Sequence, residues 1–335
     1  MDKDDLVLVA GGGGFIGGHL VGRLLESGFR RVRAVDIKPL DEWYQVFPQA
    51  ENESRDLRLR EACQAATRGA RHVFNLACDM GGMGFIEHHK AECMISVLIN
   101  THLLQAAREH GVERFLFASS ACVYAADKQT TADLLPLKES DAYPAMPEDG
   151  YGWEKLFSER MCRHFHEDYG IETRVVRYHN VYGPFGTYDG GREKAPAAIC
   201  RKVISAVTSG DREIEIWGDG EQTRSFMFIE DCLRGTIGLM ESDFRDPINL
   251  GTAEMVTINR LVDIAEKIAG VKLTRRYKLD APKGVRGRNS DNTLFRSVFG
   301  WEPSTRLEDG LAITYAWIEE QMKADAAGRQ TRRAY

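Results

Sequence analysis

Residues 6–17, LVLVAGGGGFIG, decide the fold of this chain. The short apolar run 6–10 is typical of a strand that is buried on both faces of a parallel sheet, and the pattern of 15–26 predicts a helix directly after it. Between the two, Gly11, Gly14 and Gly17 follow the spacing G-x-x-G-x-x-G. Glycines at this place permit a tight turn and let the backbone approach a pyrophosphate at the helix N-terminus. The stretch therefore predicts a dinucleotide-binding unit.

An acidic residue ends the next predicted strand, 31–36. Asp36 lies 19 residues beyond Gly17, where a carboxylate accepts hydrogen bonds from a ribose 2′-hydroxyl and repels a 2′-phosphate. This position favours NAD over NADP. Lys38, two residues further on, weakens that preference because a cation there can neutralise a 2′-phosphate.

Strand and helix patterns alternate up to about residue 181. The predicted strands are 6–10, 31–36, 72–77, 114–119 and 172–178, and the predicted helices are 15–26, 61–68, 92–110 and 154–169. Beyond them we expect helices at 195–209, 229–241, 258–269 and 307–324, with strands at 213–217 and 247–250. Alternation of this kind predicts a parallel sheet covered on both faces. We therefore predict an α/β protein with a Rossmann-like doubly wound parallel sheet in residues 1–181 and a probable return segment near 226–252, followed by a smaller α/β C-terminal substrate domain, mainly 182–335.

Length and composition exclude several classes of protein. The 335 residues are enough for roughly two domains, and 43% hydrophobic with 28% charged residues is ordinary for a globular protein. The net charge of -6 argues against a protein that coats nucleic acid. Seven cysteines without a C-x-x-C pair predict free thiols in a reducing cytoplasm. No apolar stretch suits a membrane span, and the histidines lack companions for a metal site.

Tyr151 and Lys155 form a Y-x-x-x-K motif at a predicted helix start. One helical turn places both side chains on one face. A neighbouring ammonium and a positive nicotinamide favour the phenolate, which lowers the pKa of the tyrosine toward that of a useful base. Ser120, after the strand 114–119, is the third candidate. Taken alone, a Y-x-x-x-K pattern is more typical of a solvated helix face.

Together with the glycine motif, these residues resemble the extended short-chain dehydrogenase/reductase superfamily, whose members act largely on nucleotide sugars. The resemblance covers most of the chain. The Asp-Glu pair that a 4,6-dehydratase of this superfamily carries after its Ser/Thr is replaced here by Ala121-Cys122. Dehydration is therefore disfavoured, and epimerisation is favoured.

Cys122 and Lys194 are two further acid–base candidates. A ketone at C4 of a sugar acidifies the hydrogens on C3 and C5. A thiolate on one face of the ring and an ammonium on the other can remove and return a proton with inversion. The plainer alternatives are a core cysteine and a solvated lysine.

Six motifs spread along the chain resemble the GDP-mannose 3,5-epimerase family. They are CDMGGMG (78–84), SSACVY (119–124), YHNVYGPFGT (178–187), GREKAP (191–196), WGDGEQTRS (217–225) and GVRGRNSDN (284–292). Cys78 departs from the family, which usually has alanine there, and 87–100 is diverged. The resemblance implies Cys122 as base, Lys194 as acid, and Tyr151, Lys155 and Ser120 for the redox steps.

The resemblance also implies the binding residues. The implied NAD contacts are Gly11, Gly14, Phe15, Ile16, Gly17, Asp36, Asp56, Leu57, Leu76, Ala77, Tyr151 and Lys155. The implied GDP-sugar contacts are Gly81, Ser120, Ala121, Cys122, Asn180, Glu193, Lys194, Ala195, Lys202, Gln222, Thr223, Arg224 and Arg288. The basic members suit a diphosphate, and we expect Lys194, Lys202, Arg224 and Arg288 to converge on one cleft. A homodimer is implied as well.

Two alternatives stay open at this point. One is another NAD-dependent nucleotide-sugar epimerase that acts on a different sugar, such as a GDP-heptose, or at a single centre. The other is a catalytically silent NAD-binding regulatory protein, against which the intact Ser120, Tyr151 and Lys155 count.

Overall fold

The computed structural model describes residues 1–133, 135–281 and 284–328. The strands are β1 Leu6–Ala10, β2 Arg31–Asp36, β3 Glu51–Ser54, β4 Ala70–Asn75, β5 Arg114–Ser120, β6 Glu172–Tyr178, β7 Val181–Tyr182, β8 Glu213–Trp217, β9 Thr223–Ser225, β10 Met227–Phe228, β11 Ile248–Leu250, β12 Met255–Thr257, β13 Thr274–Lys278 and β14 Gly287–Arg288. The helices are α1 Phe15–Glu26, α2 Arg60–Thr67, α3 Met83–His88, α4 Lys90–Ile95, α5 Val97–Glu109, α6 Tyr151–Tyr169, α7 Ala195–Ser209, α8 Ile229–Glu241, α9 Ile258–Ala269, α10 Thr293–Phe299 and α11 Leu307–Ala326. Short 3₁₀ turns include η2 Ala121–Val123.

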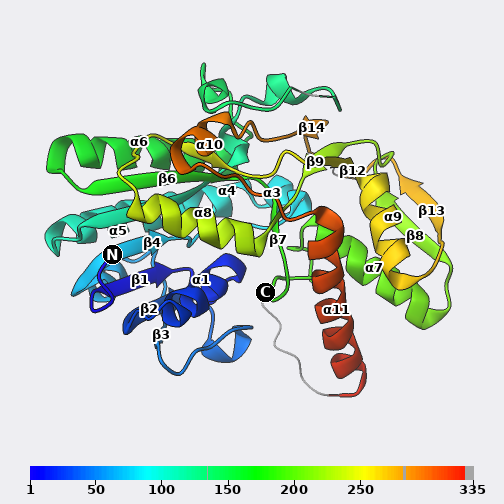
Figure 1. The fold of residues 1–335 in the computed structure, drawn as a ribbon, viewed down its shortest axis with the longest axis horizontal. Helices are drawn as coiled ribbons and strands as arrows, with labels where there is room; N and C mark the ends of the chain where they lie inside the picture. Colours follow the sequence, from blue (N-terminus) through cyan, green and yellow to red (C-terminus); the bar gives the residue numbers. More distant parts are fainter. Residues whose placement is uncertain (134, 282–283, 329–335) are drawn as a thin grey trace.

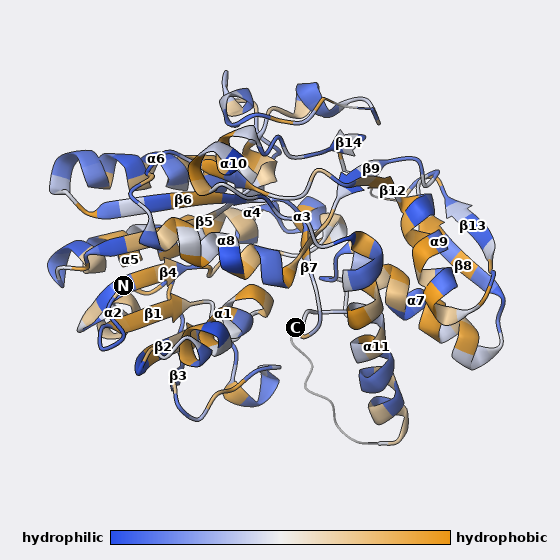
Figure 2. Cartoon of the chain, viewed as in Figure 1, coloured by the Kyte–Doolittle hydropathy of each residue, from blue (hydrophilic) through white to orange (hydrophobic). Residues whose placement is uncertain are grey.

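A seven-stranded parallel sheet organises the chain (Figure 1). Its strand order is β11-β6-β5-β4-β1-β2-β3, so that the order reverses between β1 and β4. Every residue of β1 is buried, and Figure 2 shows this strand as apolar throughout. The predicted doubly wound α/β fold is confirmed. Ligands of such sheets bind beyond the carboxyl ends of the strands, next to the point of reversal.

The segments that follow β6 build a smaller group beside this sheet. In Figure 1, α7, α9 and α11 lie together with the β8–β13 pair on one side of the central sheet. β11 instead pairs with β6 in parallel and extends the main sheet, and α8 packs against α1 and β6. The part of the chain after β6 therefore contributes both to the central sheet and to the smaller group of elements beside it. Among the described residues, none of the helices is long and apolar enough to cross a membrane.

One predicted helix is divided in the structure. The pattern of 92–110 predicts a single helix, whereas α4 ends at Ile95 and α5 begins at Val97. Ser96, between them, is buried and its hydroxyl accepts a hydrogen bond from the backbone N–H of Asp79 at 2.9 Å. The break is thus set by a contact with a distant segment.

The glycine turn after β1 leaves no room for larger side chains. A Cβ at Gly17 would lie 2.0 Å from the carbonyl oxygen of Gly11. We expect Gly17→Ala to lower the free energy of unfolding by about 1–3 kcal/mol, because the turn must move to relieve this clash. Urea titration followed by circular dichroism measures this change.

Gly238→Ala is the matched control for this substitution. At Gly238, in α8, the nearest atom to an added Cβ is a ring carbon of Phe299 at 3.9 Å. Alanine there should be neutral or stabilise the helix by about 0.5–1 kcal/mol. Equal stability of the Gly17 variant and the wild type would contradict the close packing of this turn.

Candidate active site

The turn between β1 and α1 forms a backbone cradle. The N–H groups of Gly11 and Gly12 donate to the carbonyl of Val35 at 2.7 and 3.1 Å. Gly14 precedes α1 without a side-chain cap, so the first N–H groups of this helix stay available to an anion. A Cβ at Gly11 would lie 2.9 Å from the backbone nitrogen of Ala77. The cradle therefore has the shape and polarity that a dinucleotide pyrophosphate requires.

Asp36 lies where a ribose would be recognised. It is buried at the end of β2, and its carboxylate accepts the N–H of Lys38 at 3.1 Å. The ammonium of Lys38 is turned back and donates to the carbonyl of Gly13 at 2.9 Å. Asp56 is paired with Arg58 at 2.7 Å. In the described contacts, no side-chain cation binds the carboxylate oxygens of Asp36. The residues present therefore fit NAD.

Tyr151 is the first residue of α6 and is buried together with Lys155. The ammonium of Lys155 lies 5.5 Å from the centroid of the Tyr151 ring. Burial raises the pKa of Tyr151 well above its ordinary value, and a hydrogen bond with Ser120 opposes this rise. Desolvation of the phenolate therefore outweighs this hydrogen bond. The combined effect of the Lys155 ammonium and a positive nicotinamide on this pKa stays a prediction. Ser120, Tyr151 and Lys155 are nevertheless brought together as predicted.

Two further groups contact Lys155, and the motif analysis assigned a role to neither of them. The carboxylate of Glu154 lies 3.4 Å from the ammonium of Lys155 and accepts the hydroxyl of Ser158 at 2.9 Å. The thiol of Cys78 interacts with both Lys155 and Tyr151. Burial alone would lower the pKa of Lys155, but Cys78 and Glu154 raise it above its usual value. Lys155 is thereby held as an ammonium.

Cys122 lies in the turn η2 at the carboxyl end of β5. Its backbone N–H donates to the hydroxyl of Ser120 at 3.2 Å, which fixes the turn. The guanidinium of Arg288 donates to the Cys122 thiol at 3.5 Å and to Gln129 at 2.8 Å, and it forms an ion pair with Glu148. Arg288 therefore contacts a candidate base directly. Gln129 ends the short 3₁₀ turn Ala126–Gln129 and Glu148 lies in an irregular segment, where no periodicity or motif could have indicated them.

Lys194 is half-buried at the N-cap position of α7. Burial lowers the pKa of its ammonium, whereas the nearby thiols of Cys122, Cys78 and Cys232 oppose that change. A lowered pKa suits a lysine that must give up a proton and regain it. Lys194 thus faces the same buried group of side chains as Cys122, as the sequence predicts.

The predicted basic cleft is formed in part. Arg224 is half-buried near Cys122, and desolvation lowers its pKa to about 10. Its guanidinium donates to the carbonyls of Thr223 and Val285 at 2.7 and 2.6 Å. Lys202 instead donates to the carbonyl of Glu215 at 2.9 Å, with its ammonium 5.7 Å from the ring centroid of Trp217. Lys194, Arg224 and Arg288 therefore share the surroundings of Cys122, whereas the contacts of Lys202 are with β8.

The other predicted sugar-nucleotide residues border this region. Gln222 donates to the carbonyl of Trp217 at 2.9 Å, and its side-chain oxygen is buried without a described partner. Asn180 adopts a left-handed backbone conformation and donates to the carbonyl of Ser225 at 3.0 Å. The positions of the rest follow from the elements that contain them: Ala121 in η2, Ala195 at the start of α7, Thr223 in β9, and Gly81 and Glu193 in segments that contact each other through Gly82.

A buried polar network supports the turn that contains Ser120 and Cys122. Arg177 and Glu159 form a buried ion pair at 2.7 Å, and the hydroxyl of Ser119 donates to the same carboxylate. Tyr124 and His179 both contact the side-chain oxygen of Asn249, His179 at 3.0 Å. Ser119 and Tyr124 flank this turn, so the network holds it from both ends.

His179 should make folding sensitive to acid. Burial lowers the pKa of its imidazole from 6.5 to about 4, so the unfolded chain binds one more proton than the native state between these values. Stability is complete above about pH 6.5 and is lost as the pH falls toward 4. From pH 7 to pH 5 we expect this histidine alone to cost about 2 kcal/mol.

The test compares urea unfolding of the wild type and of His179→Gln at both pH values. The variant should lose about 2 kcal/mol less between pH 7 and pH 5, because glutamine does not titrate. Equal losses in the two proteins would contradict the assignment of this acid sensitivity to His179.

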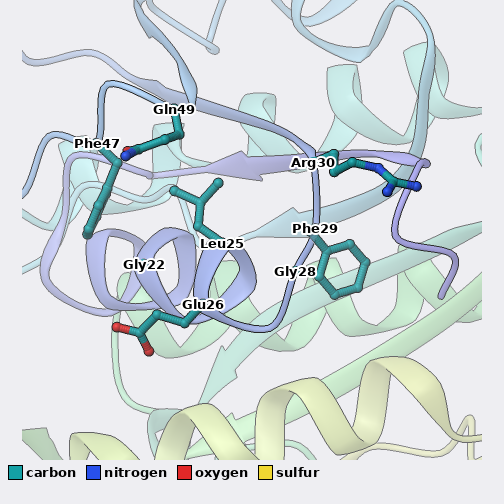
Figure 3. A pocket seen from close by; sticks show the side chains of 8 residues that line it. All are labelled: Gly22, Leu25, Glu26, Gly28, Phe29, Arg30, Phe47 and Gln49. Carbon is teal, nitrogen blue, oxygen red and sulfur yellow. The ribbon is translucent and has the colours of Figure 1, made fainter.

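A surface hollow of about 540 Å³ lies elsewhere (Figure 3). It is lined by the end of α1 and by the loop around Phe47 and Gln49, next to Gly28 and Arg30. The N-terminal end of α1 faces the glycine cradle, so this hollow at the other end of the helix is separate from the residues around Cys122. Of the predicted site residues, none lines it.

Comparisons with known proteins agree with this fold and this arrangement. Residues 7–251 match the model of the NAD dependent epimerase/dehydratase family. The chain therefore belongs to this family, and NAD is its cofactor.

Individual epimerases are similar to this chain in sequence and in structure. The chain is 48% identical to the GDP-mannose 3,5-epimerase of Arabidopsis thaliana, over 96% of this chain and 84% of that protein. GDP-mannose 3,5-epimerase 1 of Oryza sativa subsp. japonica is also 48% identical, with 95% and 83% covered. Among solved structures, UDP-glucose 4-epimerase of Thermotoga maritima with UDP-glucose superposes with a TM-score of 0.85 at 26% identity, covering 94% of this chain and 99% of that one.

Proposed function

We propose that this chain is a GDP-mannose 3,5-epimerase. It would oxidise the mannose ring at C4, exchange protons at C5 and C3, and reduce C4 again, giving GDP-L-galactose, or GDP-L-gulose when only C5 inverts. The observation that supports this best is that the pair of Cys122 and Lys194 adjoins the pair of Tyr151 and Lys155. Cys122 shares a buried cluster with Tyr151, and the half-buried Lys194 lies near the Cys122 thiol. A 4-epimerase would need only the second pair.

NAD, when bound, supplies a reversible hydride acceptor for C4. The residues that would hold it are the glycine cradle, Asp36 and the segment Leu76–Ala77. Tyr151 takes the proton of the C4 hydroxyl and later returns it, with the hydrogen bond to Ser120 favouring the phenolate. The ammonium of Lys155 favours the same charged form by its proximity.

The C4 ketone makes the neighbouring C–H bonds acidic. The Cys122 thiolate takes the C5 proton and leaves an enolate, and the Lys194 ammonium returns a proton to the opposite face of that carbon. The same cycle repeats at C3. Arg288 donates a hydrogen bond to this sulfur and orients it. After each inversion Cys122 holds one proton more and Lys194 one proton fewer, and exchange with water restores both side chains. The hydride removed from C4 returns to C4, so no net redox change results.

Turnover of GDP-mannose by the purified protein in deuterium oxide tests this function. NMR should detect GDP-L-galactose with deuterium at C3 and C5. UDP-glucose is the control substrate and should stay unchanged. Inversion at one centre only, or turnover of another sugar nucleotide in place of GDP-mannose, would favour the alternative epimerase, and the absence of any turnover would favour a silent NAD-binding protein.

We further propose a division of labour along the chain. Residues 1–181 with the return segment 226–252 would bind NAD, and 182–335 would mainly bind the sugar nucleotide. The pairing of β11 with β6 supports the first assignment, and the location of Lys194 and Arg288 supports the second. All seven cysteines are free thiols, which supports a reducing cytoplasm as the location.

A homodimer is also proposed. Exposed apolar side chains gather on the neighbouring helices α4, α5 and α6, namely Met94, Ile95, Leu98, Trp153 and Phe157. A patch of this kind is typical of a protein interface. Sedimentation analysis should give about twice the mass of 37.7 kDa, and Phe157→Glu should restore the monomer. A monomeric wild type would refute this proposal.

A further inference from the structure

Two segments that are distant in the sequence are joined beside the candidate acid. Asp79–Gly82 follows β4, and Arg192 lies two residues before Lys194. The guanidinium of Arg192 donates to the Asp79 carboxylate at 2.6 Å and to the carbonyl of Met80 at 3.3 Å. In return, the N–H of Gly82 donates to the carbonyl of Arg192 at 3.0 Å. We call this set of contacts the Asp79–Arg192 latch.

The latch is packed closely and joins the buried centre. The guanidinium of Arg192 lies 3.8 Å from the centroid of Phe85, and Phe85 is buried in one cluster with Cys122 and Tyr151. A Cβ at Gly82 would lie 2.4 Å from the carbonyl oxygen of Glu193. The two backbones therefore touch directly, and the segment before Lys194 has little room to shift.

Lys194 is consequently held from two directions. On one side it is the N-cap residue of α7, a helix of 15 residues. On the other side, Arg192 anchors the preceding chain to Asp79. The carboxylate of Glu193, between them, accepts hydrogen bonds from the guanidinium of Arg201 at 3.1 Å and from the N–H of Gly191 at 2.7 Å. Cys122, by contrast, is fixed by Ser120 and Arg288, which belong to neither segment of the latch.

We propose that Arg192, held by Asp79, is a positioning residue that sets the place of the Lys194 ammonium relative to the Cys122 thiol. This proposal rests on the proposed function. It has a specific consequence, because the two proton transfers depend on different supports. A loosened latch leaves proton removal by Cys122 intact and impairs proton delivery by Lys194. The enolate then regains a solvent-derived proton from Cys122, on the face from which the proton left.

The experiment follows deuterium in Arg192→Gln and Asp79→Asn, with GDP-mannose as substrate in deuterium oxide. The ratio to measure is the amount of deuterated GDP-mannose recovered, divided by the amount of epimerised product formed. In both variants we expect this ratio to rise and kcat for epimerisation to fall by about 10- to 100-fold, with KM changed by less than about twofold. Arg192→Lys should recover part of kcat, since an ammonium can keep the ion pair but not the second contact.

Arg245→Gln is the matched control. Arg245 forms a similar exposed ion pair with Glu172, at 2.9 and 3.1 Å, away from the site, and its loss should leave the ratio and kcat unchanged. A fall in kcat with an unchanged ratio in the latch variants would overturn the proposal, because it indicates a general loss of structure. If Arg192→Gln does not fold, the same ratio is measured in Asp79→Asn and Arg192→Lys, and these two variants test the proposal. A wild type without deuterium at C3 and C5 would instead refute the proposed function.

Discussion

Cys122→Ser should lower kcat for epimerisation by about 10²- to 10⁴-fold, the range expected for loss of a general base. A serine hydroxyl ionises far less readily than a thiol, although it keeps the hydrogen bonds of the turn. Arg288 donates a hydrogen bond to the Cys122 thiol at 3.5 Å, and the shorter serine side chain changes this contact. The amount of deuterated product and the deuterium in recovered GDP-mannose should both fall with kcat.

Oxidation at C4 should persist in this variant, since Tyr151 and Lys155 are unchanged. Acid quenching followed by borodeuteride reduction labels any 4-keto sugar at C4, and this label should still appear. Cys63→Ser is the matched control, because Cys63 is a buried thiol whose hydrogen bond to the carbonyl of Leu57, 3.0 Å long, a hydroxyl can replace. Full activity of Cys122→Ser would remove Cys122 as the base.

Tyr151→Phe should stop every step of the reaction, with kcat lowered by at least about 10²-fold. Phenylalanine preserves the buried ring but takes away the group that accepts the C4 hydroxyl proton. Without the C4 ketone, the hydrogens at C3 and C5 are not acidic. The borodeuteride label at C4 and the deuterium at C3 and C5 should therefore be lost together, unlike in Cys122→Ser.

Tyr169→Phe, at the exposed end of the same helix, is the control for this change. It should keep activity and both labels. Deuterium exchange at C5 in Tyr151→Phe would show that the C–H bonds are activated without oxidation at C4, which would contradict the mechanism.

The sequence predicted the parts of this site that depend on short-range pattern. Apolar runs and glycine spacing place β1, α1 and β2 at the bounds that the structure has, because burial on both faces and a tight turn leave a local signature. Helical spacing likewise predicts that Tyr151 and Lys155 share a face. The resemblance to known motifs then singles out Cys122 and Lys194.

Other parts of the site depend on contacts that local pattern does not encode. The ion pair of Arg288 with Glu148 joins a two-residue strand to an irregular segment. The pKa of Tyr151 is raised by burial, which only the packed structure reveals. Asp79 and Arg192 lie within two motifs that the sequence does single out, but their pairing becomes visible only when both segments are placed in space.

The break at Ser96 has a consequence for how this surface can evolve. Ile95 and Leu98 are exposed on either side of it, whereas the Ser96 hydroxyl accepts the N–H of Asp79 at 2.9 Å. Asp79 in turn binds Arg192, two residues from Lys194. Two hydrogen bonds in series thus link the outer surface of α4 and α5 to the segment of the acid. Substitution of Ile95 or Leu98 leaves both hydrogen bonds in place, whereas loss of the Ser96 hydroxyl removes the acceptor of the Asp79 N–H and loosens this chain of contacts at its outer end.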